Sequence, residues 1–391
     1  MHDLIIVGGG IAGLRVGIES LKRGVNCCIL EKYDIGGRVS TFKKVLPGGP
    51  VQWESGAGRI STTHKKVLKL FKQYGLTFVP HSSGSQYIDT ENKPNIFNEL
   101  IDVYLEPLKK LDPMILATHT LGQLFEKIGV PPFYIQFPYF SEIHVLRADR
   151  ALYTFSNEMG SASFGSCKEG MSALIDGMRE EFISLGGKIV LGMDVFNIHK
   201  NMVFCKDTFN NTFHTKTFHT KTFHAKKIVL AVHSNALKMI KGIHAPVLKY
   251  LEMQPLLRIY AVFSEPVNIP RIVTDSPIRY VIPIRPNIVM ISYTDGDDTR
   301  FWKDKGQEEV IAELRKIVDV PDPIFFKKHY WRDGCTYWLP GAYNVEEESE
   351  KSLQIAENVF VCGESYAVNQ CWIESALDQA DKLLERFRAY I

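Results

Sequence analysis

The pattern of apolar and polar residues at the start of the chain predicts a strand, a helix and a second strand. Residues 4–7 (LIIV) are a short apolar run, which is typical of a strand buried on both faces. After three glycines, apolar residues recur on one side of a predicted helix that Gly24 ends. Residues 25–30 (VNCCIL) predict the second strand.

The turn between the first strand and the helix follows the pattern G-x-G-x-x-G. Gly8 permits the tight turn, Gly10 lets a pyrophosphate approach the backbone, and Gly13 allows the helix to pack closely on the strand. Ile11 and Ala12 begin the helix, whose free N–H groups and positive dipole end can bind phosphate. The turn therefore predicts a dinucleotide-binding site.

An acidic residue completes this pattern at the end of the second strand. Glu31 is placed to accept hydrogen bonds from a ribose diol, and a carboxylate there disfavours a 2′-phosphate. Strand, turn, helix, strand and acid arrive in order within about 30 residues. We therefore prefer a nucleotide site to the alternative, an ordinary βαβ turn without a ligand.

A second glycine-rich turn follows Glu31 and distinguishes between the two common dinucleotides, NAD and FAD. Residues 36–38 (GGR) and 54–60 (ESGAGRI) come after Glu31, and an NAD-dependent dehydrogenase has no need of such a turn. In this order the segments resemble the flavin-containing amine oxidase family, which includes monoamine, polyamine and L-amino-acid oxidases. The resemblance implies that Arg38 neutralises the pyrophosphate of FAD and that residues 56–59 lie along its isoalloxazine ring.

Further segments match the same family in the expected order. Residues 170–174 (GMSAL) open a helix, and the strand at residues 188–191 leads to Val195, whose backbone would bind the adenine. Residues 228–232 (IVLAV) match the strand that closes this middle block. Residues 359–364 (VFVCGE) match the strand that delivers an acid to the flavin ribityl chain.

The last match is the start of the final helix. Residues 371–377 (CWIESAL) stand where the family has a glycine-aromatic-x-Glu-Gly-Ala pattern, and the resemblance implies that the helix dipole faces the flavin C2 carbonyl. Cys371 and Ser375 replace the usual glycines, so we expect a tighter or shifted turn. The residues that we assign to FAD are Gly8, Gly10, Ile11, Ala12, Gly13, Glu31, Lys32, Gly37, Arg38, Gly56, Ala57, Gly58, Arg59, Val195, Ala231, Trp331, Gly363, Glu364, Trp372 and Ile373.

The matched segments predict an α/β fold, namely a Rossmann-like FAD-binding domain of the GR2 type with an inserted α+β substrate-binding domain. The FAD-binding domain is expected to be discontinuous, with residues 1–75, 166–235 and 326–391. The substrate-binding domain takes residues 76–165 and 236–325. Periodicity predicts helices at residues 98–110, 120–128 and 307–318, a break at Pro131 and Pro132, and strands at residues 258–263, 280–284 and 288–293.

Aromatic residues near the end of the chain are candidates for a substrate cage. In the family two rings stand against the flavin face, one at the position of Trp372 and one before the final strand, where Tyr337 and Trp338 are the candidates. Such a cage would attract an amine through cation–π contacts and exclude water. The alternative is that these rings pack in the core, as most aromatic residues do.

Arg258 is the fourth candidate catalytic residue. It stands where the family usually has a lysine that holds a water molecule at flavin N5. Arginine stays protonated and presents a rigid fork of donors, so it can orient water but cannot exchange a proton at neutral pH. It could instead meet a substrate carboxylate or pair with a neighbouring acid, and these alternatives remain open.

The resemblance implies an FAD-dependent oxidoreductase that oxidises a primary amine or a polyamine. A hydride equivalent would pass from the carbon beside a neutral nitrogen to flavin N5, the imine would hydrolyse to an aldehyde, and O2 would regenerate the flavin with release of H2O2. The alternatives are another flavin-dependent dehydrogenase or desaturase, an NAD(P)H-using flavoenzyme, or a scaffold in which FAD only stabilises the fold.

A cysteine near the predicted cage raises the question of covalent flavin attachment. Some monoamine oxidases attach FAD to a cysteine in a Gly-Cys-aromatic stretch, which Gly334 and Cys335 resemble. Thr336 replaces the aromatic residue, and the spacing to Pro340 is shorter than in the family pattern. We therefore expect non-covalent FAD.

A tandem repeat of five residues (TFHTK, TFHTK, TFHAK) occupies residues 212–226. A period of five matches neither a strand face nor a helix face, so His214, His219 and His224 need not converge on a metal ion. We interpret the repeat as an exposed hairpin or loop, and we expect no metal site.

Composition narrows the choice of partners and compartment. In 391 residues, 46 basic and 44 acidic residues give no reason to expect nucleic acid or an anionic membrane as a partner. The 7 cysteines include no CxxC pair, which argues against a disulfide framework and for a reducing compartment. No apolar run of about 18 or more residues occurs. We therefore expect a cytoplasmic protein without a membrane span, whose oligomeric state the sequence leaves open.

Overall fold

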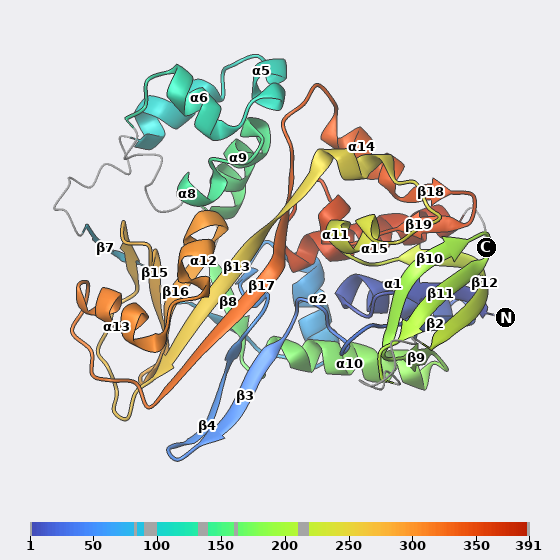
Figure 1. The fold of residues 1–391 in the computed structure, drawn as a ribbon, viewed down its shortest axis with the longest axis horizontal. Coiled ribbons are helices and arrows are strands. Elements are labelled where there is room, and N and C mark those ends of the chain that lie inside the picture. Colours follow the sequence, from blue (N-terminus) through green and yellow to red (C-terminus); the bar gives the residue numbers. More distant parts are fainter. Residues whose placement is uncertain are drawn as a thin grey trace.

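Two sheets form the centre of the molecule, and the chain crosses from one to the other more than once (Figure 1). The structure, a computed structural model, describes residues 2–81, 84–89, 100–131, 140–159, 163–209 and 219–388. None of the helices in these ranges combines the length and the apolar character that crossing a lipid bilayer requires.

The first sheet has a parallel centre. Strand β1 (His2–Val7) lies between β2 (Cys27–Leu30) and β12 (Thr220–Leu230) and is parallel to both. Strands β9 (Lys188–Val190) and β19 (Val359–Val361) extend the parallel arrangement on either side. The residues of β1 and β2 are largely apolar because separate hydrophobic clusters cover both faces of the sheet. This arrangement confirms the predicted Rossmann-like α/β class.

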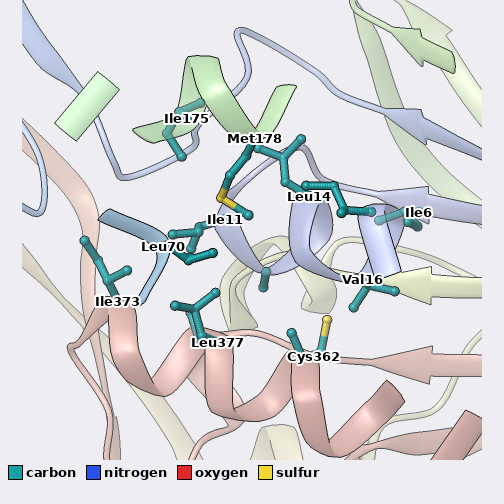
Figure 2. Packing of buried hydrophobic residues seen from close by; sticks show 14 of the residues in the cluster. Ile6, Ile11, Leu14, Val16, Leu70, Ile175, Met178, Cys362, Ile373 and Leu377 are labelled. Carbon is teal, nitrogen blue, oxygen red and sulfur yellow. The ribbon is translucent and has the colours of Figure 1, made fainter. Parts of the chain in front are cut away.

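Three helices cover one face of this sheet: α1 (Ile11–Leu21), α10 (Met171–Ser184) and α15 (Ile373–Arg388). Figure 2 shows α1 between the other two, with Leu14 and Leu377 pointing into the shared core. Both side chains are almost completely buried, which stabilises the fold by about 1.5–3 kcal/mol for each. The shared core therefore holds the start of α1 and the start of α15 in fixed positions.

An antiparallel hairpin carries the described part of the tandem repeat. Strand β11 (Met202–Asp207) pairs with the first half of β12, which contains the last copy of the repeat at residues 222–226. His219 and His224 are exposed, and His214 lies outside the described residues.

The second sheet is mostly antiparallel, in the order β17-β13-β16-β15-β14-β7. The predicted strands at residues 258–263, 280–284 and 288–293 correspond to β13, β15 and β16. Strand β17 pairs with β13 along its length, so its residues lie in this sheet. The domain boundaries stay a prediction. The strands are β7 (Gln86–Ile88), β13 (Leu251–Val262), β14 (Ile272–Thr274), β15 (Tyr280–Arg285), β16 (Ile288–Asp295) and β17 (Phe325–Trp338).

Helices surround the second sheet. The helix predicted at residues 120–128 is α6 (Leu121–Lys127), and the one at 307–318 is α13 (Gln307–Arg315). The described part of residues 98–110 contains η1 (Leu100–Leu105) and α4 (Glu106–Leu108), and Pro132 lies outside the described residues. The remaining elements are β3 (Thr41–Leu46), β4 (Gly49–Glu54), β5 (Ile60–Ser61), α2 (Lys65–Gln73), β6 (Phe78–Pro80), α5 (Pro113–Thr118), α8 (Phe140–Ile143), α9 (Ala148–Thr154), η2 (Phe155–Met159), β8 (Phe164–Cys167), β10 (Met193–His199), α11 (Ser234–Lys238), η3 (Pro246–Tyr250), α12 (Gly296–Lys303), α14 (Val345–Ser352), β18 (Gln354–Ala356) and η4 (Glu364–Tyr366).

Candidate cofactor and substrate site

The glycine turn after β1 is packed so tightly that two of its glycines have no room for a side chain. Gly8 has a φ of +103°, and a Cβ there would lie 2.5 Å from the carbonyl oxygen of Ala231. A Cβ on Gly13 would lie 2.1 Å from the carbonyl oxygen of Gly8. These close approaches hold the start of α1 against the ends of β1 and β12.

Three other glycines face open space. A Cβ on Gly10 would meet no atom nearer than 3.9 Å, and a Cβ on Gly37 would meet only the Cα of Gly10, at 3.6 Å. A Cβ on Gly363 would meet nothing within 4 Å. No side chain of the described residues caps the start of α1, so its first amides are available to an anion. This cradle of backbone fits the phosphates of FAD.

Glu31 directly follows β2, beside the cradle. Its Oε2 accepts a hydrogen bond from the N–H of Gly9 at 2.7 Å, and its Oε1 accepts one from the N–H of Tyr33 at 2.8 Å. The bond from Gly9 holds the carboxylate next to the glycine turn, as its predicted contact with a ribose requires, and the bond from Tyr33 fixes it within its own loop. Lys32, which we also assigned to the cofactor, pairs with Asp194 at 3.2 Å.

An ion pair joins the second glycine-rich turn to the end of the chain. Arg38 Nη2 lies 2.7 Å from Glu364 Oε2, and Arg38 Nη1 donates to the carbonyl oxygen of Gly334 at 3.0 Å. Glu364 Oε1 accepts from the N–H of Cys371 at 2.7 Å and of Thr336 at 3.3 Å. Burial acts to lower the pKa of Arg38, but the adjacent Glu364 carboxylate outweighs it and the pKa is raised. Segments far apart in the sequence therefore meet at one charged centre.

The segment predicted to border the isoalloxazine lies against the same turn. The N–H of Ala57 donates to the carbonyl oxygen of Arg38 at 2.9 Å. A Cβ on Gly56 would lie 2.1 Å from that oxygen, so the approach requires glycine. A Cβ on Gly58 would lie 2.2 Å from the Glu54 side chain. The expected flavin-ring and pyrophosphate segments are thus neighbours.

Two half-buried acids of the matched segments position the helices around the site. Glu54 Oε1 accepts from the N–H of Met171 at 3.0 Å, at the start of α10. Glu374 accepts from the N–H groups of Lys66 and Val67, at 2.9 and 3.0 Å, at the start of α2. Each carboxylate stabilises the positive end of a helix that is distant in the sequence.

Arg258 is attached to the flavin-ring segment through backbone carbonyls. Its Nη1 donates to the carbonyl oxygens of Gly56 and, at 3.3 Å, of Glu54, which also accepts from the hydroxyl of Tyr260 at 2.7 Å. Its guanidinium carbon lies 5.2 Å from the centroid of the Tyr293 ring. Within the described part of the chain Arg258 has no ion pair, and its buried Nε–H has no hydrogen-bond partner. That N–H is a donor that the described residues leave unused.

We expect the substitution Arg258→Met to lower the free energy of unfolding by about 1–3 kcal/mol, because two carbonyl oxygens lose a charged donor. Urea denaturation of the purified protein measures this loss. The matched control is Arg300→Met, whose guanidinium is exposed and pairs with Asp297 on the surface. Equal stability of the two variants would contradict the role of Arg258 as a backbone anchor.

Trp372 lies in an aromatic group at the start of α15. Its ring stacks on Phe164 with centroids 5.9 Å apart and meets the edge of His64 at 4.9 Å. The Arg59 guanidinium lies over Trp372 at 5.2 Å and over Phe164 at 4.7 Å. Burial and the nearby Arg59 lower the pKa of His64 to about 4, so this ring is neutral at pH 7. Arg59 and Trp372, both assigned to the cofactor, are therefore in direct contact.

The other predicted aromatic residues lie elsewhere. Trp338 is only 1% exposed and donates from Nε1 to the carbonyl oxygen of Ala367 at 3.0 Å, so the structure places it in the core rather than on a cavity. Tyr337 is half-buried beside β13, and burial together with Glu252 raises its pKa to about 12. Trp331 donates to the carbonyl oxygen of Ser55 at 2.6 Å, which puts it at the flavin-ring segment.

The remaining assigned residues lie on the elements that frame the cradle. Val195 belongs to β10 and pairs with Cys205 of β11. The N–H of Ala231 donates to the carbonyl oxygen of Val7 at 2.8 Å, directly after β12. Ile373 is buried in the core at the start of α15 (Figure 2).

The turn before α15 keeps a conformation that favours glycine. Cys371 has a φ of +71°, and its Sγ lies 3.5 Å from the carbonyl oxygen of Thr336. A left-handed backbone at a non-glycine residue costs about 1–3 kcal/mol. Neither Cys371 nor Cys335 forms a disulfide within the described residues.

Two family models match the chain. Residues 133–382 match the model described as flavin containing amine oxidoreductase, and residues 6–74 match that of an NAD(P)-binding Rossmann-like domain. A flavin-containing amine oxidase of Danio rerio is 32% identical over 77 residues, which are 19% of this chain and 14% of that protein.

Solved structures with the same fold cover the whole chain. A mutant putrescine oxidase aligns with a TM-score of 0.77 at 14% identity, over 100% of this chain and 99% of that one. The cyclohexylamine oxidase of Brevibacterium oxydans IH-35A aligns with a TM-score of 0.77 at 16% identity, over 99% of each chain.

Proposed function

The chain belongs to the flavin-containing amine oxidoreductase family, and from this premise we propose that it binds FAD non-covalently and oxidises a primary amine or a polyamine with O2 as the electron acceptor. One observation carries the proposal: the first glycine turn, the GGR turn and Glu364 meet through the bridge between Gly10 and Gly36 and the ion pair of Arg38. When bound, FAD would accept a hydride equivalent from the carbon beside the amine nitrogen.

The residues of the first domain would bind and orient the cofactor. The open backbone at Gly10 and Gly37 and the uncapped start of α1 suit the pyrophosphate, whose charge Arg38 would neutralise. Glu31 would bind the adenosine ribose and Glu364 the ribityl chain. Both carboxylates already accept backbone hydrogen bonds, so they need little reorganisation when a ligand arrives.

The residues at the start of α15 would shape the amine site. Trp372 and Phe164 stack on each other under the Arg59 guanidinium, and these rings would exclude water from the site. Arg258 would hold the backbone of the flavin-ring segment and orient a water molecule through Nε–H. Because arginine stays protonated, this residue orients the water but does not take up the proton that the amine must lose.

Purified protein is expected to be yellow and to bleach when a suitable amine is added without oxygen. Admitting air should restore the colour and release H2O2, and a broad amine panel followed by absorbance identifies the donor. Flavin that stays oxidised with every amine would contradict the proposal. Reduction by NADH but by no amine would select an NAD(P)H-using flavoenzyme instead.

A further inference from the structure

A cavity that contains none of the residues assigned to FAD lies beside the hairpin of β3 and β4. Figure 1 shows this hairpin extending away from the body of the molecule. The cavity has a volume of about 380 Å³, within the range of about 300–1,000 Å³ that is usual for small-molecule sites. The residues that line it are Lys43, Lys44, Val45, Pro50, Val51 and Gln52 of the hairpin and Arg285 at the end of β15.

The hairpin that forms most of this cavity is held against the second sheet by buried side chains. The rings of Phe42 and Trp53 stack with centroids 4.8 Å apart, and Trp53 stacks on Tyr260 of β13 at 4.9 Å. Trp53 is only 2% exposed, and its Nε1 donates to Nε2 of His329 at 2.9 Å. Val51 is buried in the same hydrophobic cluster. The wall of the cavity is therefore fixed in place, and a ligand needs little reorganisation of the protein.

Three of the seven residues that line the cavity carry a positive charge, and none carries a negative charge. Other surface cations have an acidic neighbour, as Lys351 has Glu347 at 2.7 Å. In the part of the chain that the structure describes, no ion pair includes Lys43, Lys44 or Arg285, and all three residues are exposed. Their charges are uncompensated, so the cavity favours an anion.

The single acid of the hairpin sequence, Glu54, is bound elsewhere. Its Oε1 accepts from the N–H of Met171 at 3.0 Å, and its Oε2 accepts from the hydroxyl of Thr41 at 2.9 Å. The ammonium of Lys44 lies 5.0 Å from the centroid of the Phe325 ring, a contact that positions the cation without neutralising it. The hairpin thus supplies cations to the cavity and uses its carboxylate at the start of α10.

We propose that this cavity binds a phosphate group, carried by a ligand whose apolar part lies against the three apolar residues of the lining. A phosphate monoester has about 1.5–2 negative charges at pH 7 and three acceptor oxygens, whereas a carboxylate has one charge. An arginine can bind phosphate through two parallel N–H donors and a lysine binds it as a point charge, and Arg285 and the two lysines supply both. The inference goes beyond the proposed function and does not depend on it.

Calorimetric titration of the FAD-loaded protein with phenyl phosphate tests the inference in solution. Bound FAD occupies the glycine cradle, so the probe does not bind there. We expect phenyl phosphate to bind on the order of 10-fold more tightly than benzoate, which has the same ring and a single charge. Arg285→Met and Lys43→Met should each weaken the binding of phenyl phosphate by about 10-fold, because each removes a charged donor.

Two exposed cations that lie outside the cavity provide matched controls. Arg300 pairs with Asp297 on α12, and Lys316 pairs with Glu313 at 2.7 Å. Arg300→Met and Lys316→Met should leave the affinity for phenyl phosphate unchanged. Flavin content and thermal melting confirm that each variant is folded.

Vesicles distinguish a soluble phosphate compound from the headgroup of a lipid. The protein is sedimented with phosphatidylcholine vesicles that contain or lack phosphatidic acid. Binding that needs phosphatidic acid and is lost in Arg285→Met would identify a lipid headgroup, and binding of phenyl phosphate without vesicle binding would identify a soluble ligand. The inference is overturned if neither probe binds, if benzoate binds as tightly as phenyl phosphate, or if Arg285→Met and Lys43→Met bind like the wild type.

Discussion

The Gly13→Ala variant is expected to lose FAD and to unfold more easily than the wild type. The added Cβ would lie 2.1 Å from the carbonyl oxygen of Gly8, so the start of α1 must move away from β1. Overpacking of this kind costs about 1–3 kcal/mol of stability. The movement also displaces the amides that would bind the pyrophosphate, and an affinity loss of roughly 100-fold is about 2.7 kcal/mol of binding free energy.

Gly48→Ala is the matched control, because a Cβ at that position would meet nothing within 4 Å and the backbone there is unstrained. FAD titration of flavin-depleted protein gives the affinity, and urea denaturation gives the stability. The account of the turn is wrong if Gly13→Ala binds FAD as tightly as Gly48→Ala does.

Arg38→Met is expected to destabilise the protein by about 3–5 kcal/mol, because it leaves the carboxylate of Glu364 buried without its cation. The double variant Arg38→Met with Glu364→Gln should recover most of that loss, since the uncompensated charge is then gone. Thermal unfolding of both single variants and of the double variant completes a double-mutant cycle, which measures the coupling energy between Arg38 and Glu364. Neither variant should hold FAD as the wild type does, because Arg38 would no longer neutralise the pyrophosphate.

Arg332→Met is the surface control for this cycle. Arg332 is 80% exposed and pairs with Asp333, and we expect removal of such a surface pair to leave the stability nearly unchanged. Losses that simply add in the double variant would show that Arg38 and Glu364 act independently.

The cofactor half of the molecule could be predicted well because its signals are local. Gly8 and Gly13 mark a turn whose steric demands are visible in the sequence, and the structure shows the same close approaches. The apolar run of β1 predicts a strand buried on both faces, which is how it lies. In each case the residues that determine the local structure lie within one short segment of the sequence.

The substrate half was less predictable because its determinants depend on pairing between distant segments. Trp331 and Trp338 are both tryptophans of β17 and cannot be told apart by sequence pattern. In the structure Trp338 is buried in the core, whereas Trp331 is hydrogen bonded to Ser55. The hydrogen bonds that Glu54 and Glu374 accept at the starts of distant helices exist only after the helices pack on the sheets. For the same reason strand β17 was not predicted, since its partner β13 is far away in the sequence.

The central claim is that the first glycine turn, Glu31, Arg38 and Glu364 hold one and the same FAD molecule. Titration of FAD into flavin-depleted protein, followed by the absorbance of the flavin and by thermal melting, tests it most directly. We predict saturation at one FAD per chain, a higher melting temperature when FAD is bound, and complete release of FAD on denaturation. A protein that stays colourless and melts at the same temperature with and without FAD would contradict the claim.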